Sequence, residues 1–155
     1  MRNCHLRFVP ISLACVAGPV FAEAAKQAPC VEAVNQVFAA QDWQIVSPNV
    51  QAGDLLQFDA TGKWTYVKGA GHSSGPNGYA PAPTDAEPFR SAFKLPSAAI
   101  GVLIAKIGNN APFVVGASTV MSSPSSGPLY MRMNDVNHED NDGDVIVKTK
   151  LCRNA

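Results

Sequence analysis

The chain has 155 residues, and its 12 Lys and Arg balance its 12 Asp and Glu, so the formal net charge is zero. Nucleic acids and anionic membrane surfaces favour clustered Lys and Arg, and this sequence contains no such cluster. A transmembrane helix needs about 20 consecutive apolar residues, whereas the longest useful apolar run beyond residue 22 is Ala98–Ile107. We therefore expect neither a nucleic-acid partner nor a transmembrane segment.

Residues 1–22 have the pattern of an export signal. Arg2 and Arg7 form a positively charged start, Phe8–Val20 supplies the apolar stretch, and the small residue Ala22 ends a cleavage site. We expect cleavage after Ala22 and export to the periplasm or the extracellular space. Cleavage removes two of the 12 basic residues, which leaves ten basic and 12 acidic residues.

A lipoprotein signal is the alternative, because Leu13-Ala14-Cys15 resembles the motif that precedes a lipid-modified cysteine. Ser12 stands where that motif has a large aliphatic residue. The sequence therefore favours ordinary cleavage after Ala22.

Two cysteines, Cys30 and Cys152, remain after cleavage, one near each end of the processed chain. Exported proteins fold in an oxidising compartment, where such a pair is expected to form a disulfide rather than to stay as two thiols. We divide the chain into the signal at 1–22, an N-terminal extension at 23–36 that carries Cys30, and one domain at 37–155.

Short strand-like runs separated by turn residues predict an all-β fold. The 12 glycines and 12 prolines leave no long amphipathic helix between them, and many short strands are typical of an antiparallel β-sandwich or jelly roll. The segment 31–40 fits a short helix or turn followed by a strand. The predicted strands are Asp54–Asp59, Lys63–Tyr66, Ile100–Ile107, Pro112–Gly116, Thr119–Met121, Leu129–Met133 and Asp144–Leu151.

A long segment rich in Pro, Gly, Ser and Ala covers Gly69–Pro96, and loops of this length are usually functional or disordered. It begins with Gly71-His72-Ser73-Ser74-Gly75, which matches the G-x-S-x-G motif of hydrolases. That motif requires a strand, a sharp turn and a helix, but a turn at Gly75–Gly78 follows here. We therefore expect a protein that is not an enzyme.

The densest chemistry lies between the last two predicted strands, in Met133–Asp144, which contains five acidic side chains and three amides. Ca²⁺ binds carboxylate, amide and backbone carbonyl oxygens, and a divalent cation relieves the repulsion between such carboxylates. An EF-hand is excluded, because counting from Gly143 places His138 and Thr149 where its Asp and Glu belong. The alternative is a solvated acidic turn that binds nothing.

Four stretches of the chain resemble the calcium-dependent galactophilic bacterial lectins of the PA-I type and related small carbohydrate-binding modules. The resemblance extends from about Val37 to Leu151 and implies a galactose-binding-like sandwich with one Ca²⁺ at its edge. The stretches are Val50–Asp54 with Ala60–Trp64, Gly75–Gly78, Leu103–Gly108 with Pro112–Gly116, and Gly127–Tyr130 leading to Asn134-Asp135 and Asp140–Gly143.

The resemblance also implies the residues of the site. Asp135 would bind both metal and sugar, the side chains of Asp140 and Asn141 would be further metal ligands, and Asp142 is an alternative to them. Backbone carbonyls of Asn137 and Tyr66 would complete the shell, although the loop is two residues shorter than in the lectins. Sugar contacts would come from Asp135, Val136 and Asp140.

One departure concerns the sugar, because Ala82 stands where the galactose-binding lectins have a histidine. We therefore expect Ca²⁺ binding without galactose specificity. Tyr79, Asp85 and Glu87 are candidates for contacts with a different ligand, or are ordinary loop residues. The candidates for an aromatic platform beneath the sugar are Tyr66 and Tyr79, whereas Trp43 and Trp64 are expected in the core.

Two hypotheses for function follow. The first is a secreted lectin in which two sugar hydroxyls ligate a loop-bound Ca²⁺ and neighbouring carboxylates accept their hydrogen bonds. The second is a calcium-stabilised sandwich that binds a protein partner in the cell envelope.

Overall fold

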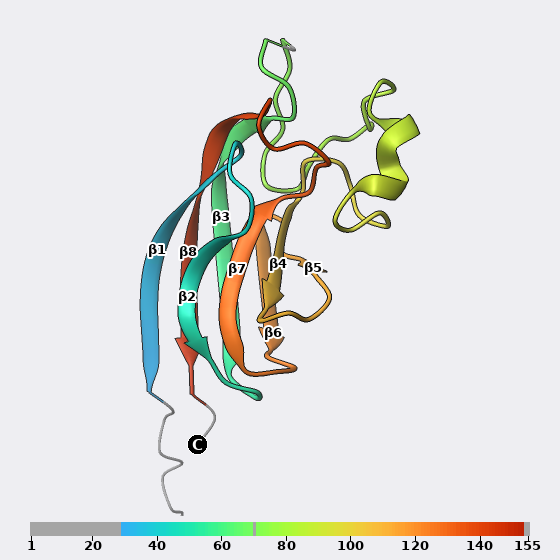
Figure 1. The fold of residues 1–155 in the computed structure, drawn as a ribbon. Helices are drawn as coiled ribbons and strands as arrows, with labels where there is room; N and C mark the ends of the chain where they lie inside the picture. Colours follow the sequence, from blue (N-terminus) through green and yellow to red (C-terminus); the bar gives the residue numbers. More distant parts are fainter. Residues whose placement is uncertain (1–28, 70, 154–155) are drawn as a thin grey trace, which may run out of the picture.

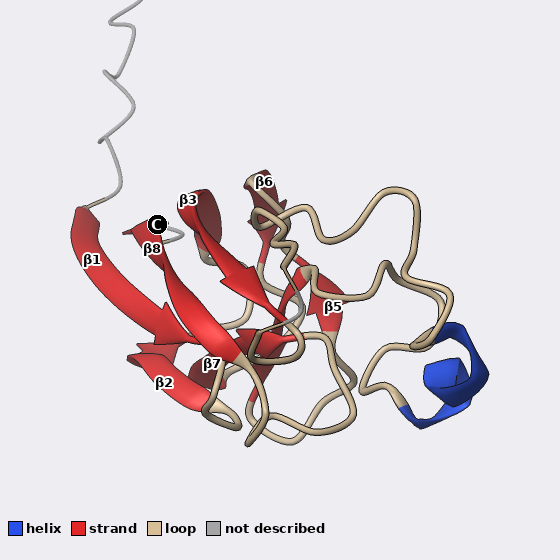
Figure 2. Cartoon of the chain, turned by 90° about the horizontal axis from the view of Figure 1, so that it is seen from above, coloured by secondary structure: helices blue, strands red, loops and turns tan. Residues whose placement is uncertain are grey.

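A computed structural model of the chain describes residues 29–69 and 71–153, so the predicted signal at 1–22 lies outside the described residues. Within them the strands pack as two layers, and one 3-10 helix lies to the side of these layers (Figures 1 and 2). The elements are β1 (Cys30–Phe38), β2 (Gln44–Val50), β3 (Leu55–Thr65), η1 (Glu87–Ala92), β4 (Leu103–Ile107), β5 (Phe113–Val114), β6 (Ser118–Ser122), β7 (Gly127–Met133) and β8 (Asp142–Cys152). Among the described residues, no helix is long and apolar enough to cross a membrane.

The strands form two four-stranded sheets, one in the order β1-β8-β3-β6 and the other in the order β2-β7-β4-β5. Every strand pair in both sheets is antiparallel. The predicted antiparallel β-sandwich is therefore confirmed. Because β7 lies in one sheet and β8 in the other, the acidic segment between them crosses one end of the sandwich (Figure 1).

The core lies between the two sheets and follows the period-2 alternation of strands. In β3 the buried side chains alternate with exposed ones, and β8 repeats the pattern. Trp64 is in the core as expected, and its indole N–H donates to the carbonyl of Gly101 at 2.8 Å. Trp43 is not in the core cluster, because it lies half-buried at the surface with Lys106 Nζ 4.8 Å from its ring centre.

Strand β1 corrects two expectations about the N-terminal part of the chain. Residues 30–38 form one continuous strand rather than a helix or turn followed by a strand. The sandwich therefore begins at Cys30, and residues 30–36 belong to the sheet instead of to an extension. The helical spacing of Val31, Val34 and Phe38 was misleading, because the long pairing with β8 decides the backbone conformation.

The predicted disulfide between Cys30 and Cys152 is confirmed, with the two Cα atoms 4.0 Å apart. Cys30 lies directly opposite Cys152 in the β1–β8 register. The bridge therefore fastens an edge strand to its neighbour at the end of the sheet.

The predicted break between two strands at Thr61-Gly62 does not exist, because β3 runs through it. Gly62 has φ +128°, and a Cβ on it would lie 2.6 Å from the carbonyl oxygen of Asp144. This glycine therefore permits a close approach of β3 and β8. Close approach of another backbone is one of the known reasons for glycine inside a strand.

We expect Gly62→Ala to destabilise the fold by about 2–4 kcal/mol, because it combines left-handed strain with a backbone collision. The matched control is Gly69→Ala, since Gly69 has φ +77° and nothing within 4 Å of its added Cβ. Urea unfolding of both variants measures the difference. Equal losses would mean that the contact with β8 is unimportant.

Strand β2 had no counterpart in the predicted set, because Pro48 interrupts its sequence pattern. The structure places β2 at the edge of its sheet, and its pairing with β7 shifts register twice. A proline is tolerated at such a position because an edge strand leaves one side of its backbone unpaired.

Candidate functional site

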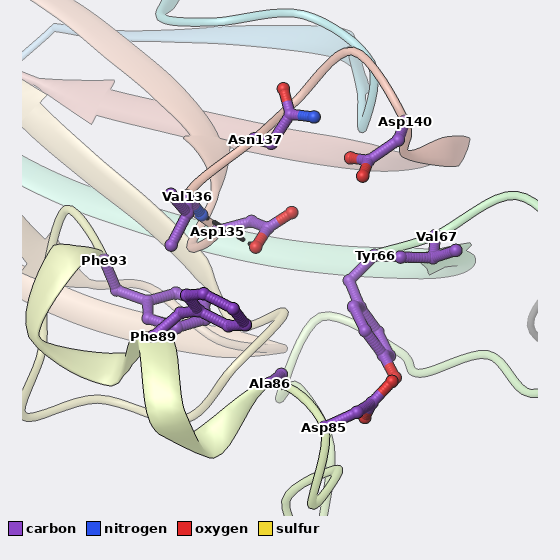
Figure 3. Close-up of a pocket in the computed structure, with 10 residues that line it drawn as sticks. All are labelled: Tyr66, Val67, Asp85, Ala86, Phe89, Phe93, Asp135, Val136, Asn137 and Asp140. Atoms are coloured by element: carbon purple, nitrogen blue, oxygen red, sulfur yellow. Dashed lines mark hydrogen bonds between the residues drawn. The ribbon is translucent and has the colours of Figure 1, made fainter.

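A cavity of about 350 Å³ opens where the β7–β8 loop, the helix η1 and the segment after β3 meet (Figure 3). Its volume falls within the roughly 300–1,000 Å³ typical of small-ligand pockets. It is lined by Tyr66, Val67, Asp85, Ala86, Phe89, Phe93, Asp135, Val136, Asn137 and Asp140. Residues that are far apart in the sequence therefore line a single cavity.

The acidic side of the cavity is formed by Asp135 and Asp140, whose carboxylates point toward one another in Figure 3. Asp135 is buried at 6% exposure, and its Oδ1 accepts the backbone N–H of Val136 at 2.7 Å. The carbonyl of Asp140 accepts the backbone N–H of Lys68 at 2.7 Å. This bond fastens the acidic loop to the segment that carries Tyr66, as the predicted ligand set requires.

Burial raises the pKa of Asp135 above its ordinary value, and the nearby Asp140 carboxylate raises it further. The Val136 N–H, the Asn141 amide and the Arg132 guanidinium lower the pKa of Asp135, but they do not cancel the effect of burial. The ionised form of Asp135 is therefore under-compensated. A cation placed between Asp135 and Asp140 would supply the missing charge.

Asn141 lies behind this pair rather than at the cavity wall. Its side chain is fully buried, and its Nδ2 donates to the carbonyl of Ala39 at 3.2 Å and to the sulfur of Met133 at 3.4 Å. Its Oδ1 is buried and has no hydrogen-bond partner among the described residues. Buried amide oxygens rarely remain unpaired, so this oxygen fits the predicted role as a metal ligand.

The other acidic residues of the loop do not join the site, since Glu139, Asp142 and Asp144 are absent from the cavity wall. In the part of the chain that the structure describes, no group of three or more His, Cys, Asp or Glu could hold a metal. A calcium shell here would consist of two carboxylates together with amide and backbone oxygens. The side chain of Asn137 points away from the cavity in Figure 3, and its Oδ1 accepts the N–H of Glu139 at 3.3 Å.

The apolar side of the cavity comes from Phe89 in η1 and from Phe93, the residue that follows η1, and both lie next to Val136 (Figure 3). Phe93 is 5% exposed and belongs to the core cluster, whereas Phe89 is 60% exposed. Arg90 pairs with Glu87 and donates to the carbonyl of Ala98 at 3.0 Å, which holds η1 against the following segment. Glu87 is used in this ion pair and does not line the cavity.

Tyr66 and Asp85 close the end of the cavity beyond the carboxylate pair. The Tyr66 hydroxyl donates to the Asp85 carboxylate, with its two oxygens at 2.8 and 2.9 Å. Burial, followed by this hydrogen bond and the charge of Asp85, raises the pKa of Tyr66 to about 12. The hydroxyl therefore keeps its proton and holds the exposed Asp85 side chain at the cavity rim.

Tyr79, predicted as a candidate for a sugar contact and an aromatic platform, is not among the residues that line this cavity. It is 9% exposed, and its ring stands edge-on to that of Tyr66 with centroids 5.2 Å apart. A Cβ on Gly101 would touch this ring at 2.9 Å, which shows how closely it is packed. The Tyr79 side chain therefore packs in the core.

The segment with the hydrolase-like motif is built into the sandwich. The backbone of Ser74 exchanges hydrogen bonds with that of Trp64 at 3.1 and 2.9 Å, and the chain then turns at Gly75–Gly78. The strand, turn and helix that the motif requires are not formed there.

Two buried polar residues that sequence reasoning did not select hold the acidic loop in place. Arg132 pairs with Asp42 and donates to the carbonyl of Asp135 at 3.1 Å. Asn134 bonds through its side chain to the backbone of Leu95 and Ala99 at 3.0–3.1 Å. The Asn134 contacts fix the start of the loop relative to the segment that follows η1, and the Arg132 contacts fix it relative to Asp42.

No protein-family profile matches this chain, and a comparison with curated proteins found no match. A solved structure described as "EclA N-terminal domain; PllA-like lectin" is similar in fold, with a TM-score of 0.59. The match covers 76% of this chain and 94% of that chain at 20% sequence identity. This likeness supports the predicted lectin-like fold.

Proposed function

We propose that this protein is an exported carbohydrate-binding protein whose cavity holds a sugar on a bound Ca²⁺. One observation carries the proposal: a single cavity combines the facing carboxylates of Asp135 and Asp140 with the aromatic wall of η1. Carbohydrates need both kinds of surface, because hydroxyl groups and apolar C–H faces occur on the same ring. The lectin-like fold and the Cys30–Cys152 disulfide are consistent with this proposal.

The residues that would hold the ion are Asp135 and Asp140 through their carboxylates and Asn141 through its unpartnered Oδ1. Backbone carbonyls of Tyr66 and Asn137 would add oxygens from the neighbouring segments. Ca²⁺ takes six to eight oxygen ligands, so this set leaves positions for two adjacent sugar hydroxyls. The bound ion would supply charge to orient these hydroxyls.

The protein's own side chains would then orient the sugar. Asp135 and Asp140 can accept hydrogen bonds from the hydroxyl groups, and charged acceptors make bonds roughly twice as strong as neutral ones. Phe89 is the exposed ring of the cavity and can cover the apolar face of the sugar. Asp85 offers a further acceptor at the rim. Ala82, in the place of a histidine, indicates a sugar other than galactose.

A second candidate function is a calcium-stabilised module that binds a protein partner. The favouring observation is the apolar wall itself, because Phe89 and Val136 are 60% and 38% exposed. Exposed aromatic side chains are common anchors in protein interfaces.

Glycan-array binding with and without a calcium chelator tests the proposal. We expect a glycan signal that the chelator removes and that Phe89→Ala weakens by roughly tenfold or more, as expected for a lost aromatic contact of about 1.5 kcal/mol. The matched control is Ile45→Ala, because Ile45 is also 60% exposed but does not line the cavity. Melting that responds to the chelator without any glycan signal would support the second candidate instead.

A further inference from the structure

Among the described residues, strand β1 lies at the edge of its sheet, with β8 as its neighbour on one side. It is nine residues long and pairs with β8 over its whole length, from Cys30 opposite Cys152 to Phe38 opposite Asp144. Figures 1 and 2 show it on the side of the sandwich away from η1, and therefore away from the cavity.

The hydrogen bonds at the two ends of β1 reveal which backbone groups point outward. Pro29 accepts from the N–H of Arg153 at 3.0 Å, and the N–H of Ala39 donates to Gly143 at 2.9 Å. In an antiparallel pair the residues that bond to the partner alternate with residues that face away. Odd-numbered residues of β1 therefore bond to β8, and Glu32, Val34 and Gln36 direct their N–H and C=O groups away from the sheet.

The outward groups end at a cap. The Gln44 side chain accepts the N–H of Phe38 and donates to the carbonyl of Phe38, with both distances 2.9 Å. Within residues 29–69 and 71–153, the outward backbone groups of Glu32, Val34 and Gln36 make no such contact. The unpaired part of the edge is thus a short, defined segment centred on Val34.

This segment lacks the usual protection of an edge strand. Native edges are commonly blocked by Pro, by Lys, by bulges or by a covering loop. Strand β1 contains neither Pro nor Lys, and its register with β8 runs without a shift. Its one charged side chain, Glu32, is paired with Lys150 of β8 at 3.3 Å. Val31 and Val34 are each 67% exposed, so apolar surface accompanies the unpaired backbone groups.

We propose that two copies of this chain associate through their β1 strands, antiparallel and around a two-fold axis at Val34. Each Val34 would lie opposite its equivalent in the second copy, and each Glu32 would lie opposite Gln36. This arrangement satisfies the outward groups of all three residues in both chains and opposes no like charges. It also stops before Phe38, which Gln44 already caps.

The pairing joins the two sheets into one continuous sheet and leaves both cavities open, because η1 lies on the other side of each sandwich (Figure 2). A closed two-fold interface of this kind is self-complementary and does not propagate into a fibre. The proposal does not depend on the ligand of the cavity.

Sedimentation velocity of the processed, disulfide-bonded protein tests the proposal. We expect a concentration-dependent dimer, and we expect Val34→Lys to shift it to monomer by placing two charges opposite each other. The matched control is Val120→Lys at β6, the other edge of the same sheet, where Val120 is 61% exposed. A wild-type protein that stays monomeric at millimolar concentration, or a dimer that survives Val34→Lys, would overturn the proposal.

Disulfide crosslinking tests the proposed register of the two β1 strands and complements the sedimentation experiment. Residues facing each other in a hydrogen-bonded antiparallel pair have Cα atoms about 5.5 Å apart, which lies within the range for a disulfide. Val34→Cys should therefore give a covalent dimer under mild oxidation, while Val120→Cys should not. Equal crosslinking of both variants would show random encounters and contradict the proposed axis.

Discussion

Asp135→Asn is expected to weaken Ca²⁺ binding by more than about 100-fold, because even groups that merely orient metal ligands contribute 10–100-fold. The substitution removes the buried carboxylate that faces Asp140 but keeps its shape and its acceptor for the Val136 N–H. With saturating Ca²⁺ the variant should melt well below the wild-type protein, since the wild type gains stability from an ion that binds the folded state. Differential scanning calorimetry measures the effect.

In chelator the same substitution should cause no loss at neutral pH. The pKa of Asp135 is raised in the folded protein, so the favourable contribution of its protonated form is complete below the unfolded-state pKa and is lost as the pH rises through the folded-state pKa. Near pH 7 the wild type carries an unfavourable ionised Asp135, so the stability of Asp135→Asn relative to the wild type should be highest there. In acid the wild-type carboxyl is protonated, and this relative advantage of the variant should disappear. Equal melting losses with Ca²⁺ and with chelator would mean that Asp135 acts through the metal-free fold.

Glu139→Gln is the matched control for this experiment. Glu139 belongs to the same loop and carries the same charge, but it is exposed and does not line the cavity. We expect its effect on Ca²⁺ affinity to be a few-fold at most, as for a screened surface charge. A loss as large as that of Asp135→Asn would indicate a general charge effect of the loop.

Removal of the Cys30–Cys152 disulfide is expected to have the largest effect on the fold. The bridge closes a loop of 122 residues, and the chain-entropy model assigns about 4–5 kcal/mol to such a loop. The double variant Cys30→Ser/Cys152→Ser should therefore melt roughly 10–20 °C lower than the wild type. Hydrogen exchange should report the loss first in β1, which is an edge strand with β8 as its one neighbouring strand among the described residues. A change in melting temperature below about 3 °C would show that pairing with β8 alone secures this strand.

The sequence predicted those parts of the fold whose signals are local. The alternation in β8 and the apolar run that became β4 each reflect burial by neighbouring strands. The acidic loop was predicted between the last two strands because its composition is unusual, and the structure places Asp135 and Asp140 at one cavity.

The parts that were missed depend on distant contacts. Gly62 was taken for a turn residue, because its contact with the Asp144 backbone is invisible in the sequence. Strand β2 was missed because it contains Pro48, which is tolerated in a strand at the edge of a sheet. The edge position of a strand depends on the whole fold and is not visible in the local sequence. The β1 strand was partly taken for a helix for the same reason.

The apolar half of the site was missed for a different reason. Phe89 and Phe93 are four residues apart within the long segment Gly69–Pro96, and this pair was the available signal for η1. Tyr79 was selected because it follows a turn that resembles one in the lectins, but its ring completes the core. Assigning the aromatic wall required the position of η1 beside Val136.

Calorimetric titration of Ca²⁺ into the processed wild-type protein tests the central claim most directly. The site described here predicts saturable binding of a single ion per chain, and it predicts that a glycan identified on the array then binds in the presence of Ca²⁺ and not in chelator. Absence of any heat of Ca²⁺ binding, together with glycan binding that is unchanged by chelator, would contradict the assignment of Asp135, Asp140 and Asn141 as an ion site.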